Sequence, residues 1–196
     1  MIIVDVEAPG ADSRKHSIVS NGALDFSNPE NQFYQECRIY KGAEIEAEAL
    51  QVNGFSEKQV KDKNKKSLEE TIKDFLQWTI SCSSKTIAGQ NPAFDRDFLR
   101  ASAEKYGIDW TFGHRTIDLH SLGYAHYLKR GLTPPNKNKK TDLNIDKVLN
   151  YVGLPDEPRP HHALTGTKME AEAFSRLIYK KSLLKEFKNY PIPDYL

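Results

Sequence analysis

The fold of this chain is decided by the stretch Ile2-Ile3-Val4-Asp5-Val6-Glu7, which places two acids in what otherwise reads as a buried β-strand. Successive side chains of a strand alternate between its faces, so Asp5 and Glu7 are expected to point the same way. Neighbouring carboxylates on an apolar strand repel each other and resist desolvation, which is usually tolerated only where a cation lies between them. We interpret the pair as half of a divalent-metal site, with solvated acids on an edge strand as the alternative.

Composition indicates one α/β domain in a chain of 196 residues. The formal net charge of +1 excludes a uniformly basic coat, so a polyanion would have to be held locally. Cys37 and Cys82 lack metal or redox spacing and are expected to be reduced thiols in a cytoplasmic protein. The chain has no leader-like or long apolar segment, which predicts neither export nor a membrane.

The order of predicted elements favours a mixed α/β sheet flanked by helices. Strands are expected at Ser17 to Phe26 and Gln32 to Tyr40, which with the first strand would form an antiparallel meander. Later, a short strand and several helices alternate, which favours added parallel strands. The short strand is predicted at 85–88, the helices at 44–50, 67–80, 93–106, 118–129, 142–152 and 163–184, and an exposed loop at 131–140.

We expect the domain to cover residues 1–185 and an irregular tail to cover 186–196. The pattern Ser67-x-x-Glu70 predicts a capping box at the start of the helix at 67–80.

Two further groups suited to chemistry follow later in the chain. Asp95 lies in Asn91-Pro-Ala-Phe-Asp95, where a predicted strand leads into a helix, a place at which α/β folds bind ligands. His161 precedes the last predicted helix, and a histidine can take a proton from water near neutral pH. By themselves these residues have ordinary alternatives, because Asp95 could stabilise a helix N-terminus and His161-His162 could be a surface pair.

Taken in order, Asp5-x-Glu7, Asn91-x-x-Phe94-Asp95 and His161-x-Ala163 resemble the DEDDh 3′-to-5′ exonucleases, the DnaQ-like family. The resemblance covers roughly residues 1 to 180. It implies a ribonuclease H-like fold and two bound Mg²⁺ or Mn²⁺ ions. It also implies that the 3′ end of single-stranded DNA or RNA enters the site and is shortened by hydrolysis to 5′-monophosphates.

The resemblance assigns a role to each matching residue. Asp5 would bridge both metals, Glu7 would hold one and Asp95 the other, and His161 would be the general base. Two hard cations about 3.5–4 Å apart can clamp the attacking and leaving oxygens of a phosphoryl displacement. Three residues are also predicted to line the substrate pocket, with core packing as the alternative for the phenylalanine: Ala8, Phe94 and His162.

The chain departs from the family at one position. An aspartate is expected five residues beyond the histidine, and Gly166 stands there instead. Three carboxylates leave a two-metal site with one excess positive charge, so we expect impaired activity. Rescue is not expected from Glu170, because Thr167-x-x-Glu170 reads as a capping box, or from Asp97, which should point away from Asp95.

Three functions therefore remain open from the sequence. The first is the metal-dependent exonuclease, and the second is a catalytically silent module that binds nucleic acid or another partner on the same fold. The third is a phosphodiesterase that acts on very short oligonucleotides, which the same site would allow. Lysines at 58–66 and 129–140 are suited to phosphate binding, and solvated loops explain them equally well. The oligomeric state is not readable from the sequence.

Overall fold

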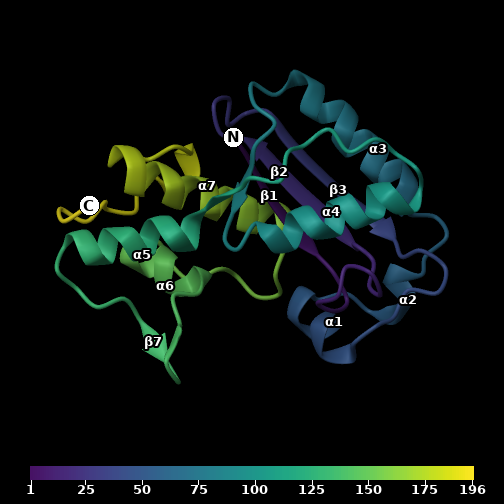
Figure 1. Cartoon of the computed structure of the whole chain (residues 1–196), viewed down its shortest axis with the longest axis horizontal. Helices are drawn as coiled ribbons and strands as arrows, with labels where there is room; N and C mark the ends of the chain where they lie inside the picture. Colours follow the sequence, from purple (N-terminus) through teal and green to yellow (C-terminus); the bar gives the residue numbers. More distant parts are fainter.

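A six-stranded sheet forms the centre of the computed structural model, which describes residues 1–196. The strand order is β4-β3-β2-β1-β5-β6, and Figure 1 shows helices on both sides of this sheet. The strands are β1 (Ile2–Glu7), β2 (Ser20–Asp25), β3 (Gln32–Arg38), β4 (Lys66–Ser67), β5 (Ile87–Gly89) and β6 (Ile117–Asp118). The helices are α1 (Ala47–Asn53), α2 (Glu57–Val60), α3 (Leu68–Trp78), α4 (Ala93–Lys105), α5 (Leu119–Lys129), α6 (Ile145–Tyr151) and α7 (Ala163–Tyr179).

The pairing of the strands confirms the predicted fold class. β1, β2 and β3 form an antiparallel meander, in which Asp5 lies opposite Gly22 and Glu7 lies opposite Ser20. β5 and β6 extend the sheet in parallel on the other side of β1, and β4 pairs in parallel with β3. The sheet is therefore mixed, with its first strand in the middle.

The side chains of β1 separate the core into two layers. Ile2, Val4 and Val6 belong to an apolar cluster that includes residues of α3 and α4. Ile3 points the other way, into a cluster formed mainly by α5, α6 and α7. Because strand side chains alternate, Asp5 and Glu7 continue the Ile3 side, so the prediction that they share a face is confirmed.

Local signals explain where several elements begin and end. The capping box at Ser67 and Glu70 is present, as predicted, at the start of α3. α7 ends at Tyr179 rather than near residue 184, because Lys180 adopts the left-handed conformation. The segment predicted as an exposed loop at 131–140 is exposed but contains a small hairpin, β7 (Asn136–Lys137) and β8 (Lys140–Thr141). Asn138 and Lys139 both have positive φ, as a two-residue hairpin turn requires.

The structure also describes the two cysteines and the apolar character of the helices. Cys37 and Cys82 are free thiols, and burial raises the pKa of Cys37 to about 12. None of the helices has the length and apolar character needed to cross a membrane.

A buried ion pair ties the C-terminal segment to α7. Arg176 and Glu172 are both fully buried, with 2.8 Å between Nε and Oε1. The guanidinium also donates to the carbonyls of Val152, Phe187 and Tyr190. Residues 186–196, predicted as an irregular tail, therefore pack against the helix, and the domain boundary at 185 stays a prediction.

We predict that Arg176→Met destabilises the protein by about 3–5 kcal/mol, because it leaves the Glu172 carboxylate buried without its partner. Arg100→Met is the matched control, since Arg100 and Glu104 are also four residues apart and 2.7 Å from each other but are 55% and 59% exposed. Its cost should be about 0–1 kcal/mol. Urea unfolding of both variants measures the difference, and equal losses would contradict this account of the tail.

Candidate active site

The fold brings together the three acids that the sequence singled out. Asp5 and Glu7 lie at the end of β1, and Asp95 lies in the first turn of α4. Oδ1 of Asp95 accepts a hydrogen bond from the backbone N–H of Val6, at 2.9 Å. This contact is possible because β5 pairs with β1 only at Ile2 and Ile3, which leaves the later N–H groups of β1 free on that side.

His161 reaches the same place from the segment before α7. Its backbone N–H donates to the carbonyl of Val52 at the end of α1, at 3.0 Å. Its Nδ1 lies 3.2 Å from Oε2 of Glu157, and its Nε2 contacts the guanidinium of Arg159. Oε1 of the same Glu157 and Oδ2 of Asp5 lie 3.0 Å and 2.2 Å from the position that a Cβ of Gly166 would take, so Glu157 connects the histidine to the acids.

Glu157 is the residue of the site that the sequence analysis missed. It lies in a proline-rich segment, Leu154-Pro-Asp-Glu-Pro-Arg-Pro160, with no helical or strand periodicity to orient it. It is only 6% exposed, and its Oε1 has no hydrogen-bond partner. The one signal in the sequence is its position four residues before His161, whereas the family pattern has its acid beyond the histidine.

Gly166 lies against these carboxylates. A Cβ at position 166 would stand 2.2 Å from Oδ2 of Asp5 and 3.0 Å from Oε1 of Glu157. Two carboxylate oxygens therefore occupy the space that a side chain at position 166 would need.

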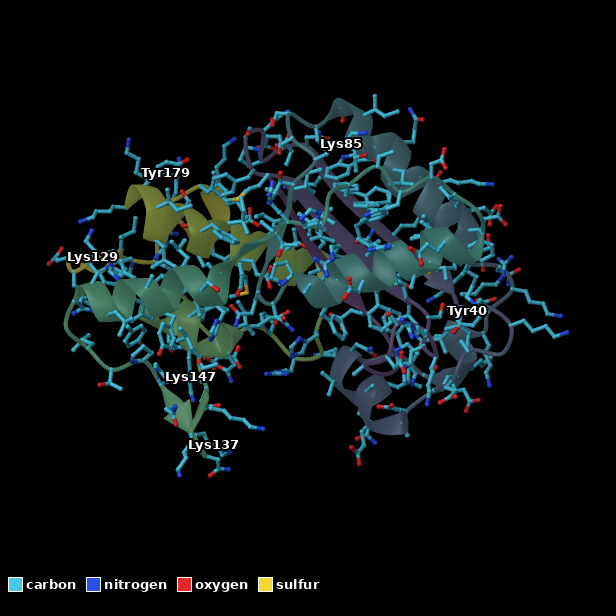
Figure 2. All side chains as sticks on the ribbon, in the orientation of Figure 1. Tyr40, Lys85, Lys129, Lys137, Lys147 and Tyr179 are labelled. Carbon is cyan, nitrogen blue, oxygen red and sulfur yellow. The ribbon has the colours of Figure 1, made fainter.

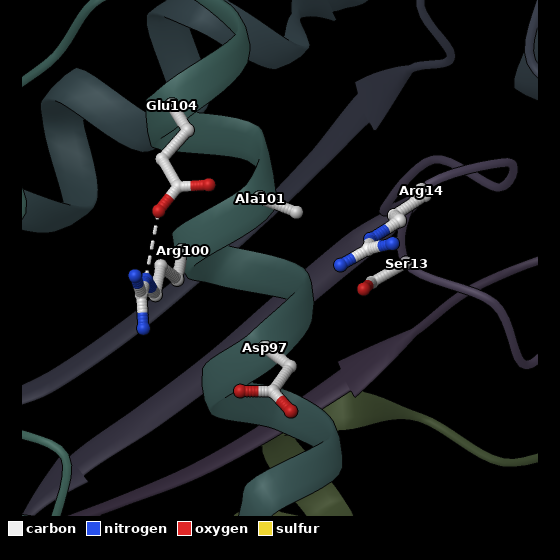
Figure 3. A pocket seen from close by; sticks show the side chains of 6 residues that line it. All are labelled: Ser13, Arg14, Asp97, Arg100, Ala101 and Glu104. Atoms are coloured by element: carbon white, nitrogen blue, oxygen red, sulfur yellow. Dashed lines mark hydrogen bonds and ion pairs between the residues drawn. The ribbon is translucent and has the colours of Figure 1, made fainter.

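The two acids considered as replacements behave differently. Asp97 points away from the site, as predicted, and pairs with Arg96 at 2.7 Å. It lines a separate pocket of about 360 Å³ between α4 and the loop at Ser13 and Arg14, seen in Figure 3.

The capping-box interpretation of Glu170 is wrong. α7 begins at Ala163, so Thr167 lies inside the helix and donates its hydroxyl to the carbonyl of Ala163 at 2.7 Å. Glu170 is 7% exposed, and its Oε2 has no partner. This oxygen lies 2.9 Å from where a Cβ of Gly89 would stand, on the β5 side of the cluster.

Burial, followed by the charges of neighbouring acids, raises the pKa values of the carboxyl groups. Burial, and then the charges of Glu170, Glu7, Asp95 and Glu157, raise the pKa of Asp5 well above its usual value. Burial raises the pKa of Glu7 to about 7, with His161 opposing the shift and Glu157 adding to it. Burial also raises the pKa of Asp95 to about 7, although the N–H of Val6 lowers it.

The donor set suits a hard divalent cation. Carboxylate oxygens are the ligands that Mg²⁺ and Mn²⁺ prefer. Glu157 and Glu170 each have a buried oxygen without a hydrogen-bond partner, which a bound cation would satisfy. As the side chains stand, however, no three His, Cys, Asp or Glu groups are arranged so that they could hold a metal ion. The residues thus fit the chemistry of the ion, and side-chain rotation would have to complete the ligand shell.

The residues predicted to contact substrate lie around the acids. Ala8 follows β1 and accepts a hydrogen bond at its carbonyl from Asn53, at 3.2 Å. Phe94 packs on Phe98 with 4.8 Å between ring centroids, and both rings line a hollow beside residues 11–13. His162 is exposed and stacks on Tyr34 at 4.4 Å. Their roles in substrate binding stay predictions.

The position of α7 depends on a glycine in β2. A Cβ at Gly22 would lie 2.4 Å from the carbonyl carbon and oxygen of Ala163, so the first turn of the helix packs directly on the backbone of the strand. Since Gly22 lies opposite Asp5 in the sheet, this contact brings the start of α7 beside the acids.

Comparison with known proteins agrees with this architecture. The chain is 24% identical over 209 residues to the ribonuclease T of Vibrio campbellii, covering 98% of this chain and 90% of that protein. It is 28% identical over 122 residues to a ribonuclease T of Haemophilus influenzae, covering 55% of this chain and 52% of that protein. No protein-family model matches the chain.

Solved structures share the fold. The nuclease domain of 3′hExo, a DEDDh family member bound to rAMP, has a TM-score of 0.69 at 18% identity and covers 94% of each chain. The zinc-bound complex of E. coli exonuclease I with single-stranded DNA has a TM-score of 0.72 at 14% identity, over 91% of this chain and 40% of that one. The predicted resemblance to the DEDDh exonucleases is confirmed, and this chain has their fold.

We predict that Gly22→Ala lowers the free energy of unfolding by about 1–3 kcal/mol, because the added methyl group collides with the backbone of α7 rather than with a movable side chain. Gly113→Ala is the control, since a Cβ there would have nothing within 4 Å, and it should change stability by less than about 0.5 kcal/mol. Thermal and urea unfolding compare the two variants. If both are equally stable, the close approach of α7 to β2 is not a constraint on the fold.

Proposed function

We propose that this protein is a metal-dependent exonuclease that removes nucleotides from the 3′ end of single-stranded DNA or RNA. The observation that supports this most directly is the group of buried carboxylates beside His161, at the end of β1. The fold shared with exonucleases and the similarity to ribonuclease T support the same reaction class. Water would attack the terminal phosphorus, and the bond from phosphorus to the 3′ oxygen of the preceding nucleotide would break. That oxygen would become the 3′ hydroxyl of the shortened strand, and the terminal nucleotide would be released as a 5′-monophosphate.

The acids Asp5, Glu7 and Asp95 would hold two Mg²⁺ or Mn²⁺ ions. When bound, such ions polarise the phosphate and stabilise the charge that develops on the attacking and leaving oxygens. The protein contributes a rigid arrangement, because the hydrogen bond from Val6 to Asp95 ties α4 to the strand that carries the other two acids.

His161 would take the proton of the attacking water. Glu157 accepts a hydrogen bond from Nδ1 at 3.2 Å, which leaves the lone pair on Nε2. The same hydrogen bond raises the pKa of His161, so the imidazole is a stronger base than an isolated one. Arg159 contacts Nε2 and would have to move away before this nitrogen accepts a proton.

The terminal nucleotide would enter the groove beside the histidine. This groove has a volume of about 300 Å³ and is lined by Tyr34, Asn53, His161 and His162, among others. Its aromatic wall offers a surface on which a base can stack without regard to its identity.

The two lysine clusters differ in how many of their charges are paired. Lys61, Lys65 and Lys66 are paired with Glu57, Glu36 and Asp74, so the first lysine cluster is largely neutralised. In the second cluster, no ion pair involves Lys129, Lys137, Lys139 or Lys140. Figure 2 shows Lys129 at the end of α5 and Lys137 on the hairpin β7–β8, whereas Lys147 nearby is paired with Asp142. The second cluster is therefore better suited to the nucleic-acid backbone than the first cluster.

One observation favours a second function. Gly166 removes the acid that the family carries, which suits a module that binds nucleic acid without cleaving it. Impaired activity accordingly stays a prediction.

We predict that Asp95→Asn reduces exonuclease activity by about 100-fold or more, because the amide still accepts the hydrogen bond from Val6 but carries no charge for a cation. Asp97→Asn, two residues further along the same helix and exposed, should keep the activity of the unchanged protein. The assay follows 5′-labelled single-stranded DNA and RNA in Mn²⁺, resolved as a ladder. If the unchanged protein binds both substrates and shortens neither, the binding module is the correct function.

We also predict that replacing Lys137, Lys139 and Lys140 together with Gln weakens the binding of single strands and lowers the slope of log affinity against log salt by about 2. The same replacement of Lys61, Lys65 and Lys66 should have a smaller effect, because these lysines are already paired. Fluorescence anisotropy in an Asp95→Asn background measures binding without cleavage. Equal slopes for the two triple variants would show that the hairpin does not contact phosphate.

A further inference from the structure

Without an acid at position 166, the three carboxylates of the site do not balance the charge of two divalent cations. Two divalent cations carry four positive charges, and Asp5, Glu7 and Asp95 supply three negative ones. In the family pattern the fourth comes from the first turns of the last helix, where this chain has Gly166. A replacement must therefore reach the same point from another part of the chain.

Glu157 reaches that point from the loop before α7. Its Oε1 lies 3.0 Å from the position that a Cβ of residue 166 would take, and Oδ2 of Asp5 lies 2.2 Å from the same position. The two carboxylates therefore face each other across the space that a side chain at 166 would occupy. Glycine is the residue that leaves this space open.

The two oxygens of Glu157 have different surroundings. Oε2 is engaged with Nδ1 of His161, at 3.2 Å. Oε1 is buried and has no partner, on a side chain that is only 5% exposed. A buried carboxylate oxygen without a hydrogen bond is strongly unfavourable, and a cation is the partner that removes the penalty.

The loop that carries Glu157 is held in place. Oδ1 of Asp146, in α6, accepts the backbone N–H of Glu157, and Oδ2 of the same carboxylate accepts from Arg159, both at 3.1 Å. The carboxylate of Asp146 thus accepts hydrogen bonds from the loop at residues 157 and 159. The backbone that carries the Glu157 side chain is accordingly held by α6.

We propose that Glu157 supplies the fourth carboxylate of the metal site, taking the place of the aspartate that Gly166 replaces. This inference rests on the proposed function for the existence of the site. It restores four negative charges against two divalent cations, with one oxygen directed at the cations and the other at His161. Glu170 is the competing acid, but its free oxygen lies beside Gly89, on the β5 side of the cluster.

Metal binding in the absence of nucleic acid tests the inference. Isothermal titration of Mn²⁺ into the full chain should show that Glu157→Gln weakens binding by about 10-fold or more. Glu104→Gln, an exposed acid on α4, is the control and should change the affinity by no more than about twofold. Electron paramagnetic resonance of bound Mn²⁺ counts the ions independently.

A second substitution separates a lost ligand from a general disturbance. Gly166→Asp should restore Mn²⁺ affinity in the Glu157→Gln background, because the new acid fills the place that lost its charge. In the unchanged protein Gly166→Asp should leave the affinity unchanged or weaken it, because Asp5 and Glu157 already occupy that space. If Glu157→Gln melts without cooperativity, Glu157→Met takes its place, because it also removes the carboxylate, with the same loss and rescue expected.

The inference is overturned if Glu157→Gln binds Mn²⁺ as tightly as the unchanged protein, or if the loss follows Glu170→Gln alone. It is also overturned if Gly166→Asp by itself raises the affinity, since the site would then have lacked an acid. These outcomes are distinct from a failure of the proposed function. A protein that binds Mn²⁺ through Glu157 and never shortens a nucleic acid would refute the exonuclease and leave the ligand assignment standing.

Discussion

The close contact between Gly22 and the backbone of Ala163 is the constraint on which the site depends. A helix normally packs on a sheet through side chains, which keep the two backbones well apart. At Gly22 no side chain intervenes, so the first turn of α7 lies directly on β2. Because Asp5 is the neighbour of Gly22 across the sheet, the groups around the start of α7 are brought to the acids of β1.

The close packing of α7 on β2 also places several carboxylates near one another in a buried position, where they repel each other. Glu7, Asp95, Glu157 and Glu170 are all buried, and Asp5 lies among them with only part of its surface exposed. Burial and mutual repulsion raise the pKa values of Asp5, Glu7 and Asp95. Such an arrangement opposes folding, and proteins retain it where function requires it. A bound divalent cation would reverse the sign of the interaction, because each carboxylate would then face a positive charge.

The proposed role of Glu157 suggests how a metal site can survive the loss of a ligand. The helix position that carries an aspartate in the family is occupied here by the smallest residue, and a longer acid enters the same space from the preceding loop. In this proposal a negative charge would lie at the same point of the site but come from a residue nine positions earlier in the sequence. One carboxylate would then serve both the cations and His161, so the orientation of the base would depend on the geometry of the metal site.

Much of the fold could be read from local patterns. The alternation in β1, the meander and the capping box of α3 depend on neighbouring residues, and these predictions are confirmed. The hairpin β7–β8 escaped prediction because its strands have two residues each and its turn uses Asn138 and Lys139 rather than glycine. The capping-box prediction for Glu170 is wrong because α7 begins at Ala163, which places Thr167 within the helix rather than at its N-cap.

The sequence by itself determined the pairing of Asp5 with Glu7 on one face and the order of the motifs, because strand alternation and helix entry are properties of adjacent residues. Only the tertiary structure decided that Glu157 belongs with them. Its side chain points into the site because α6, α7 and β1 converge there, and Asp146 holds the intervening loop. A contact that depends on several packed elements leaves no periodic trace in the chain, so spacing alone did not reveal it.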